Sequence, residues 1–391
     1  MSRRFTAVLA AAAMTVVLAA CGDDSDSGNG SASGGTDPIK IGAILGISGR
    51  FAFVGEPQKQ ALELAQQRIN ADGGIAGRQV EFVVYDDEVD ETKSVPLANR
   101  LISEDKVVAI IGPSITVPAL AIQPIVERAK IPNMTLTSKA IWEGKDGSYV
   151  FHTTPREEVE VKSVLSFIKD ELKVTKVGVI YDRQPYGTGN LAFIKQFAPD
   201  FGLQVVSEEG IENNDTNADA QVQRVRAAGA ETVVVWVGDP AASSVVKAIN
   251  QAGWTVPVLG SSAIAGPRFA ELAGPAAEGV YSNSTYDTKA PPANQKTFLD
   301  EFTAKFNGPP TQFAAFAYDS AYVLKGAIEA AGGKTDGESI RKGIIDMPAY
   351  EGVVATYDFA DDNHNGIPNG PLFYIVQVKG GKFEVVYDTR K

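Results

Sequence analysis

Cysteine and histidine are nearly missing from this chain, since its 391 residues include one cysteine, Cys21, and two histidines, His152 and His364. A single cysteine excludes an internal disulfide, and so few soft ligands leave little from which to build a metal centre. Basic charge is also scarce, because 36 Lys and Arg stand against 48 Asp and Glu, for a formal net charge of -12. Nucleic-acid binding needs clustered positive charge, so this balance argues against a nucleic-acid partner.

Long hydrophobic runs are confined to the first twenty residues. Arg3 and Arg4 precede an apolar stretch over 5–20, which is the pattern of a secretory signal. This stretch is shorter than the roughly 20 residues that a membrane-spanning helix needs, and no later run is as long. The pattern predicts a signal peptide over 1–20 and a mature chain that works outside the cytoplasm without a transmembrane helix.

Cys21 follows Leu18, Ala19 and Ala20, a sequence that resembles the bacterial lipobox, in which cleavage before the cysteine leaves the thiol to carry a diacylglyceryl group. An ordinary signal peptide with a chance cysteine is the alternative. The residues that follow are rich in Gly, Ser and Asp and contain no apolar stretch, which indicates a flexible tether. We therefore expect a lipid on Cys21, a tether over 21–37, and a folded part held near the membrane.

From Ile39 onward, apolar stretches alternate with amphipathic ones. Continuous apolar strands separated by amphipathic helices are typical of parallel sheets with helices on both faces. The alternation pauses around 151–158 and then restarts, which predicts an α/β protein with two doubly wound lobes. Expected strands cover 39–45, 79–86, 107–112, 131–136, 176–182, 203–209, 232–238 and 257–260, and expected helices cover 56–71, 91–104, 117–128, 158–171, 188–199, 217–228 and 240–252.

The last third of the chain has a different pattern. A strand over 279–287 leads into three successive helices with no strand between them, which indicates a return to the first lobe. Strands then follow, and the last two are joined as a hairpin through Gly380 and Gly381. The expected helices cover 292–306, 313–332 and 336–345, and the expected strands cover 353–359, 372–378 and 382–388.

Motifs for cofactors and catalysis lack their required context. Gly187 begins a match to the dinucleotide fingerprint, but several residues separate it from the preceding strand. The stretch 361–366 imitates a calcium loop, yet Leu372 stands where a bidentate glutamate belongs. No nucleophile elbow, HExxH motif or P-loop occurs. We therefore expect no cofactor and no catalysis; an enzyme with a Ser or Thr nucleophile remains the alternative from another class.

Hydroxyl side chains cluster in two loops that follow neighbouring strands. Ser114 and Thr116 follow one strand, and Thr137 and Ser138 follow the next. In an open parallel sheet, ligands bind outside the carboxyl ends of the strands, beside helix N-termini whose free N–H groups favour a carboxylate or carbonyl oxygen. Capping explains any one such residue equally well, but two clusters in neighbouring loops favour a binding site.

The chain from Ile39 to its end resembles the leucine/isoleucine/valine-binding family of extracytoplasmic solute-binding proteins, which have the type I periplasmic-binding-protein fold. The stretches that carry the resemblance are KIGAILGISGRFAFVGEPQKQALELAQQRINADGGIAGRQVEFVVYDDE (40–88), AIIGPSITVPALAIQPIVERAKIPNM (109–134), VGVIYDRQPYGTG (177–189), AEGVYSNSTYD (277–287) and FAAFAYDSAYVL (313–324).

The resemblance implies two lobes that close around a small solute, which then passes to an ABC permease. It also implies three hinge crossings, near 153–158, 282–288 and 355–360. On this basis lobe I covers 38–155 plus 286–357, and lobe II covers 156–285 plus 358–391.

The resemblance further assigns roles within the cleft. Thr116 and the loop over 137–139 hold the carboxylate of a solute, Tyr186 closes over it from the second lobe, and Phe313 falls where the family has an aromatic wall. The apolar pocket would be completed by Phe53, Val54 and Trp236, although Trp236 lies within a strand and could equally belong to the core.

One loop departs from the family pattern. Members that bind amino acids have an acid after the strand that here ends in PVLG, where this chain has Ser262 and two other small residues. A buried ammonium group without a partner costs several kcal/mol, which leaves Asp239, Asp287 and Asp319 as possible substitutes. Lys139 would favour an anion. A non-amino carboxylate or an amide therefore fits these residues at least as well as a branched-chain amino acid.

These observations predict a lipid-anchored receptor that delivers a small carboxylate- or amide-bearing solute to an ABC permease, and nothing in them points to an obligate oligomer. A ligand sensor on the same fold, reporting to a membrane regulator, is the alternative. The candidate binding residues are Ser114, Thr116, Thr137, Ser138, Lys139, Tyr186, Trp236, Ser262 and Phe313.

Overall fold

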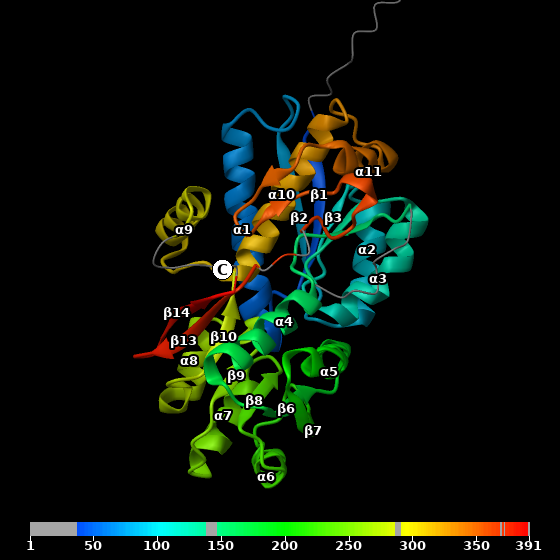
Figure 1. Cartoon of the computed structure of the whole chain (residues 1–391). Helices are drawn as coiled ribbons and strands as arrows, with labels where there is room; N and C mark the ends of the chain where they lie inside the picture. Colours follow the sequence, from blue (N-terminus) through cyan, green and yellow to red (C-terminus); the bar gives the residue numbers. More distant parts are fainter. Residues whose placement is uncertain (1–36, 138–146, 286–290, 368–369, 371, 390–391) are drawn as a thin grey trace, which may run out of the picture. The chain divides into compact units, whose positions relative to one another are not determined.

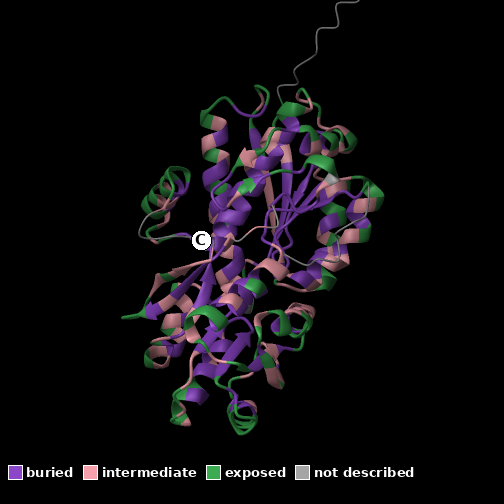
Figure 2. Cartoon of the chain, in the orientation of Figure 1, coloured by how far each residue is buried: buried purple, intermediate pink, exposed green. Residues whose placement is uncertain are grey.

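Two large β-sheets organise the chain, and helices cover both faces of each (Figure 1). The computed structural model describes residues 37–137, 147–285, 291–367, 370 and 372–389, and their contacts place them in a single unit. The central strands of both sheets are buried, whereas the helices expose their outer faces (Figure 2). This arrangement is the one expected for apolar strands between amphipathic helices.

The first sheet is parallel, with the strand order β2-β1-β3-β4-β5. In β1, Ile41 and Ala43 pack into the core formed with α1 and α10, while Ile44 packs into the core formed with α2 and α3 (Figure 1). This alternation follows from the two-residue period of a strand. The elements are β1 (Ile39–Leu45), β2 (Val80–Asp86), β3 (Ile110–Ile111), β4 (Asn133–Thr135), β5 (Val150–His152), α1 (Ala52–Ala71), α2 (Glu91–Ser103), α3 (Thr116–Ala129), α9 (Ala293–Phe306), α10 (Gln312–Ala330) and α11 (Gly337–Asp346).

The second sheet has the order β14-β13-β10-β9-β8-β6-β7 and is parallel except at β13 and β14. Those two strands form the expected hairpin, and its turn residues Gly380 and Gly381 have φ of 57° and 77°, a conformation that glycine adopts without strain. Helices α4 and α5 pack into one core of this sheet, and α6, α7 and α8 pack into the other. The elements are β6 (Lys176–Asp182), β7 (Gln204–Ile211), β8 (Thr232–Trp236), β9 (Val258–Gly260), β10 (Tyr281–Ser284), β13 (Tyr374–Lys379), β14 (Lys382–Asp388), α4 (Glu157–Phe167), α5 (Pro185–Phe197), α6 (Asp219–Ala227), α7 (Ala241–Gln251) and α8 (Pro267–Ala273).

The chain passes between the two sheets three times: between β5 and α4, between β10 and α9, and before β13. The predicted α/β architecture of two doubly wound lobes with three crossings is therefore confirmed. The third passage comes after Ile367, later than the expected 355–360, because Phe359 and Ile367 pack in the core of the first sheet. The ring of Phe359 lies 5.8 Å from that of Phe151 in β5. The expected lobe boundaries otherwise stay a prediction.

The strand expected over 353–359 is reduced to β12 (Thr356–Tyr357), which pairs with β11 (Tyr350–Glu351) in a two-stranded sheet. The cause is a turn around Asp319, whose carboxylate accepts hydrogen bonds from the amides of Val353 and Val354 at 2.7 and 2.9 Å. Short 3₁₀ or π segments complete the fold at η1 (Gly49–Phe51), η3 (Ile168–Leu172), η4 (Ala198–Phe201), η5 (Ser262–Ile264), η6 (Gly274–Ala277) and η7 (Ala360–Asp362).

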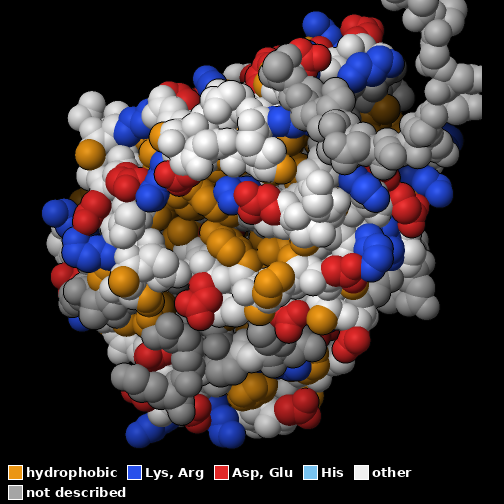
Figure 3. All heavy atoms as spheres, turned by 90° about the horizontal axis from the view of Figure 1, so that it is seen from above, with side chains coloured by type: hydrophobic (Ala, Val, Ile, Leu, Met, Phe, Trp, Pro, Cys, Tyr) orange, Lys and Arg blue, Asp and Glu red, His pale blue; other side chains and the backbone are white. Residues whose placement is uncertain are grey.

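The helices in the described residues are all too short or too polar to cross a bilayer. On the face seen in Figure 3, hydrophobic side chains gather near the middle, and Lys, Arg, Asp and Glu side chains are scattered around them.

Candidate ligand-binding cleft

A cavity of about 490 Å³ is lined by loops from both sheets. Most of these loops follow the carboxyl ends of parallel strands, which is where open α/β sheets bind ligands. From the first sheet come residues 89–92 after β2, 114–117 after β3, 136–137 after β4 and 154–155 after β5, and from the second come 184–186 after β6, 213 after β7, 238 after β8 and 262–263 after β9.

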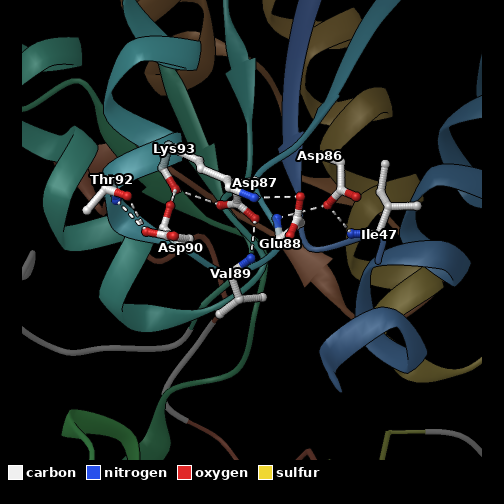
Figure 4. Close-up of polar contacts among 9 residues, drawn as sticks. Ile47, Asp86, Asp87, Glu88, Val89, Asp90, Thr92 and Lys93 are labelled. Carbon is white, nitrogen blue, oxygen red and sulfur yellow. Dashed lines mark hydrogen bonds and ion pairs between the residues drawn. The ribbon is translucent and has the colours of Figure 1, made fainter. Parts of the chain in front are cut away.

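The loop between β2 and α2 forms an acidic edge of this cavity, but its carboxylates are largely used to hold the loop itself (Figure 4). Asp86 Oδ1 accepts from the amides of Ile47 and Glu88, both at 2.9 Å. Asp90 caps α2 by accepting from the amide of Thr92 at 2.8 Å. The acidic residues of this loop therefore stabilise the N-terminus of α2 and the turn before it, as acids at a helix N-terminus usually do.

Ser114 lines the cavity, yet its hydroxyl is engaged within the protein. It donates to Gln58 Oε1 at 2.5 Å and accepts from the amide of Gly46 at 3.1 Å. These bonds join the loop after β3 to α1 and to the end of β1. Because the hydroxyl proton is already used, Ser114 is not available to donate to a solute.

Three threonines, Thr116, Thr137 and Thr154, line the first-lobe side of the cavity. Thr116 is the first residue of α3, where unpaired backbone N–H groups favour an anion or a carbonyl oxygen. The hydroxyls of Thr137 and Thr154 are buried and have no hydrogen-bond partner among the described residues. Buried hydroxyls without partners are rare, so this wall of the cavity is suited to an oxygen-bearing group of a ligand.

On the second-lobe side, a buried carboxyl group meets the loop after β9. Glu160 of α4 is 6% exposed and lines the cavity, and its Oε1 accepts from the amide of Ser262 at 2.6 Å. Burial raises the pKa of Glu160, while hydrogen bonds with Ser262 and Asn283 oppose that shift. Gln312 of α10 reaches the same place, because its Nε2 donates to Ser262 O at 2.8 Å.

Tyr186, in the first turn of α5, also lines the cavity. Burial raises the pKa of the Tyr186 hydroxyl well above its usual value, and the nearby carboxylate of Glu160 adds to the shift. Asp182 lies at the end of β6 with its pKa raised to about 6 by burial. Its Oδ1 accepts from the amide of Gln184 at 2.7 Å and so fixes the turn that presents Tyr186.

The apolar wall is aromatic. Phe53 and Phe313 lie edge to face with their ring centroids 6.3 Å apart, and the guanidinium of Arg268 in α8 lies 5.1 Å from the centroid of the Phe53 ring. Such a wall stabilises apolar or aromatic parts of a ligand. The other apolar residues that line the cavity include Phe51, Val54, Phe316 and Phe373.

The structure corrects the prediction for one binding residue and for two of the acids that were expected to replace the one missing at Ser262. Trp236 is fully buried in a core of the second sheet and is not among the lining residues, because its side chain points toward the covered face of β8 rather than past its end. Asp319 is fully buried in its hydrogen bonds to the turn over 353–354. Asp239 is buried near Arg268 outside the lining. Ser138, Lys139 and Asp287 lie outside the described residues.

Glu160, Thr154 and Gln312 line the cavity and were missed by the sequence analysis. For Glu160 a signal was present, since it shares a helix face with Val164 and Phe167, which lie four and seven residues further along, and both are buried. An acid on the buried face of a helix needs a partner in the fold.

In the described part of the chain, no cluster of three or more His, Cys, Asp or Glu residues is placed to hold a metal ion.

Two sheets whose strand ends share one cavity define the class of two-lobed solute-binding proteins. A profile of the periplasmic binding protein family matches residues 38–382. The chain therefore belongs to that family, whose members are substrate-binding proteins of the extracytoplasmic compartment.

Relatives cover most of the chain at low identity. The leucine-, isoleucine-, valine-, threonine- and alanine-binding protein of Pseudomonas aeruginosa is 27% identical over 326 residues, 81% of this chain and 85% of the relative. Leu/Ile/Val-binding protein homolog 3 of Brucella melitensis is 26% identical over 88% of this chain and 93% of the relative. Among solved structures, LivJ, the substrate-binding protein of a branched-chain amino acid transporter of Streptococcus pneumoniae in complex with isoleucine, matches with a TM-score of 0.80 at 26% identity, covering 90% of this chain and 100% of LivJ.

Proposed function

We propose that this chain is the substrate-binding protein of an ABC importer of the branched-chain-amino-acid type. It captures a small carboxylate- or amide-bearing solute, without catalysis, and delivers it to a permease. The observation that carries this proposal is the lining of the cavity by loops of both sheets. A solute that contacts both lobes favours the arrangement in which they are close together.

The oxygen end of the solute binds at the first-lobe wall. The donors are supplied by Thr116 at the start of α3 and by the hydroxyl of Thr137, which has no hydrogen-bond partner among the described residues. Ser138 and Lys139 directly follow Thr137 in the sequence, and we propose that they join this group. Tyr186, Ser262 and Phe313 contact the solute from the other walls.

The similar proteins support an amino-acid-type solute, since one is named for binding leucine, isoleucine, valine, threonine and alanine and another is a complex with isoleucine. The lipobox-like sequence before Cys21 supports an N-terminal lipid that keeps the receptor on the outer side of the cell membrane. We propose a monomer, because a cavity built by one chain needs no second copy.

The proposal is tested by thermal unfolding of the purified protein with a panel of leucine, valine, phenylalanine, benzoate, 4-hydroxybenzoate, short amides and urea. A ligand at 100 times its Kd adds about 2.7 kcal/mol to the free energy of unfolding, which raises the Tm by a few degrees. Uptake of the active solute by cells that lack this protein then separates a transport receptor from a sensor. Lost uptake supports the importer, and unchanged uptake contradicts it.

A further inference from the structure

Glu160 is a buried acid that lines the cavity and has no cationic partner among the described residues. It is 6% exposed, and among the described residues its side chain accepts hydrogen bonds but forms no ion pair. No Lys, Arg or His stands among the described residues that line the cavity, whereas Asp90, Glu91, Glu160 and Asp182 do. A buried carboxylate is costly unless a cation or several donors compensate it.

A second acceptor lies beside it. Gln312 is 5% exposed and lines the cavity. Its Nε2 donates to Ser262 O at 2.8 Å, which fixes which end of the amide is the oxygen. Gln312 Oε1 is then left buried without a hydrogen-bond partner among the described residues. An unsatisfied buried acceptor of this kind calls for a donor.

Both side chains hydrogen-bond to the backbone of one residue, Ser262. The amide of Ser262 donates to Glu160 Oε1, and the carbonyl of the same residue accepts from Gln312 Nε2. Glu160 is carried by α4 and Gln312 by α10, so helices that pack against different sheets supply the two sides. An ammonium group matches this arrangement, because it carries a positive charge and three N–H donors and has no acceptor.

We propose that Glu160 and Gln312 form the binding site for an amino group of the solute, so that the solute is an amine rather than a plain carboxylate or an amide. This inference rests on the proposed function and specifies its substrate class. The hydroxyls of Thr137 and Thr154 then bind the oxygen-bearing part of the same molecule. The raised pKa of Glu160 agrees with a carboxyl group whose charge is incompletely compensated until a cation binds.

Matched solutes test the inference on the wild-type protein by isothermal titration calorimetry. One set is L-leucine, 4-methylpentanoate, which lacks the amino group, and 3-methylbutylamine, which lacks the carboxylate. The other set is L-phenylalanine, 3-phenylpropanoate and 2-phenylethylamine. We expect binding by amine-bearing members and a Kd at least about 30-fold weaker for the amine-free acid of the same skeleton.

Glu160→Gln removes the charge and keeps an oxygen for the Ser262 amide. We expect this variant to lose at least about 30-fold in affinity for the amine-bearing solute. Glu158→Gln is the matched control, since Glu158 lies on the same helix and does not line the cavity. Its Kd should stay within about twofold of the wild-type value, as befits a partly exposed charge away from the site.

The outcomes separate the two proposals. If an amine-free acid binds as tightly as its amine, or if Glu160→Gln leaves the affinity for the amine unchanged, the amino-group site is wrong and the solute-binding function stands. If no member of either set binds the wild-type protein, the amino-group site is wrong, and the panel of benzoates, short amides and urea then decides whether the solute-binding function stands. The comparison of amine with amine-free solutes needs no variant, so it decides the question even if Glu160→Gln does not fold.

Discussion

The backbone amide of Ser262 donates a 2.6 Å hydrogen bond to Oε1 of Glu160, a residue 102 positions earlier in the chain. The loop after β9 contains no acid of its own, since Ser261, Ser262 and Ala263 stand there. The fold brings a carboxylate to this loop from α4 instead. The charge that the local sequence lacks is thus supplied by a helix that follows the first passage between the sheets.

Ser114→Ala should destabilise the protein, because it leaves Gln58 Oε1 and the amide of Gly46 without their partner in a buried place. We expect a loss of about 1–3 kcal/mol in the free energy of unfolding, measured by urea denaturation. Ser103→Ala is the control, since its exposed hydroxyl bonds only to Asn99 O, and it should change stability by less than about 0.5 kcal/mol. Equal effects of the two substitutions would contradict the role assigned to Ser114.

Gly55→Ala should disturb the cavity wall from within α1. A Cβ at Gly55 would lie 2.2 Å from Gly46 O and 2.3 Å from Gly46 C, and backbone atoms cannot yield as a flexible side chain can. We expect a loss of about 1–3 kcal/mol together with weaker solute binding, because Phe53 and Val54 precede this position in the wall.

Gly326→Ala provides the matched control for Gly55→Ala. Gly326 is also helical, and its added Cβ would meet only the end of Met347, with Cε at 3.0 Å. Alanine favours a helix over glycine by roughly 0.5–1 kcal/mol, so thermal unfolding should find this variant as stable as the wild type or more so. A larger loss at Gly326 than at Gly55 would refute the packing argument.

His152→Asn should change how stability depends on pH. Burial lowers the pKa of His152 to about 4, and its Nδ1 donates to Thr137 O at 3.0 Å. The unfolded chain therefore binds more protons than the folded one between about pH 6.5 and about pH 4. In this window His152 lowers stability as pH falls, and asparagine keeps a donor near Nδ1 without titrating.

The measurement for His152→Asn is urea denaturation at a series of pH values. The difference between the wild-type and variant curves isolates His152, because the opposite effect of Asp319, with its pKa raised to about 7 by burial, is present in both. We expect the wild type to lose stability relative to the variant as pH drops from about 6.5 to about 4. A constant difference across this range would exclude a buried neutral His152.

Cys21→Ala should release the protein from the membrane if the thiol carries the lipid. A single acyl chain binds membranes only reversibly, whereas two or more anchor a protein stably, so the wild type should sediment with membranes and the variant should appear in the soluble extracytoplasmic fraction. Metabolic labelling with a radioactive fatty acid provides the direct readout. Labelled Cys21→Ala protein would place the lipid elsewhere.

Most of the fold follows from apolar runs in the sequence. The strands expected over 39–45 and 176–182 coincide with β1 and β6, because buried parallel strands are nearly continuous runs of apolar residues. The elements that were not predicted are too short to show a periodic pattern of hydrophobic residues: β5 has three residues and α8 has seven. The strand expected over 107–112 retains only Ile110 and Ile111 in the ladder.

Some of the residues that line the cavity could be predicted from the sequence, and others could not. Thr116 and Thr137 were predicted because they follow strand ends, and Tyr186 and Ser262 were predicted from the family resemblance. All four line the cavity, because the strand ends converge on one edge of each sheet. Glu160 could not be placed in this way, because it lies inside a helix and meets Ser262 only through the fold. Trp236 was misassigned because sequence position does not say that its side chain packs against the covered face of the sheet.

The most direct test of the account is a crystal structure of the protein bound to the amine-bearing solute that calorimetry selects. The account predicts a single solute in the cavity, with its nitrogen within hydrogen-bond distance of Glu160 and Gln312 Oε1 and its oxygens against Thr116 and Thr137. A solute bound outside this cavity, or one whose nitrogen lies away from Glu160, would contradict it.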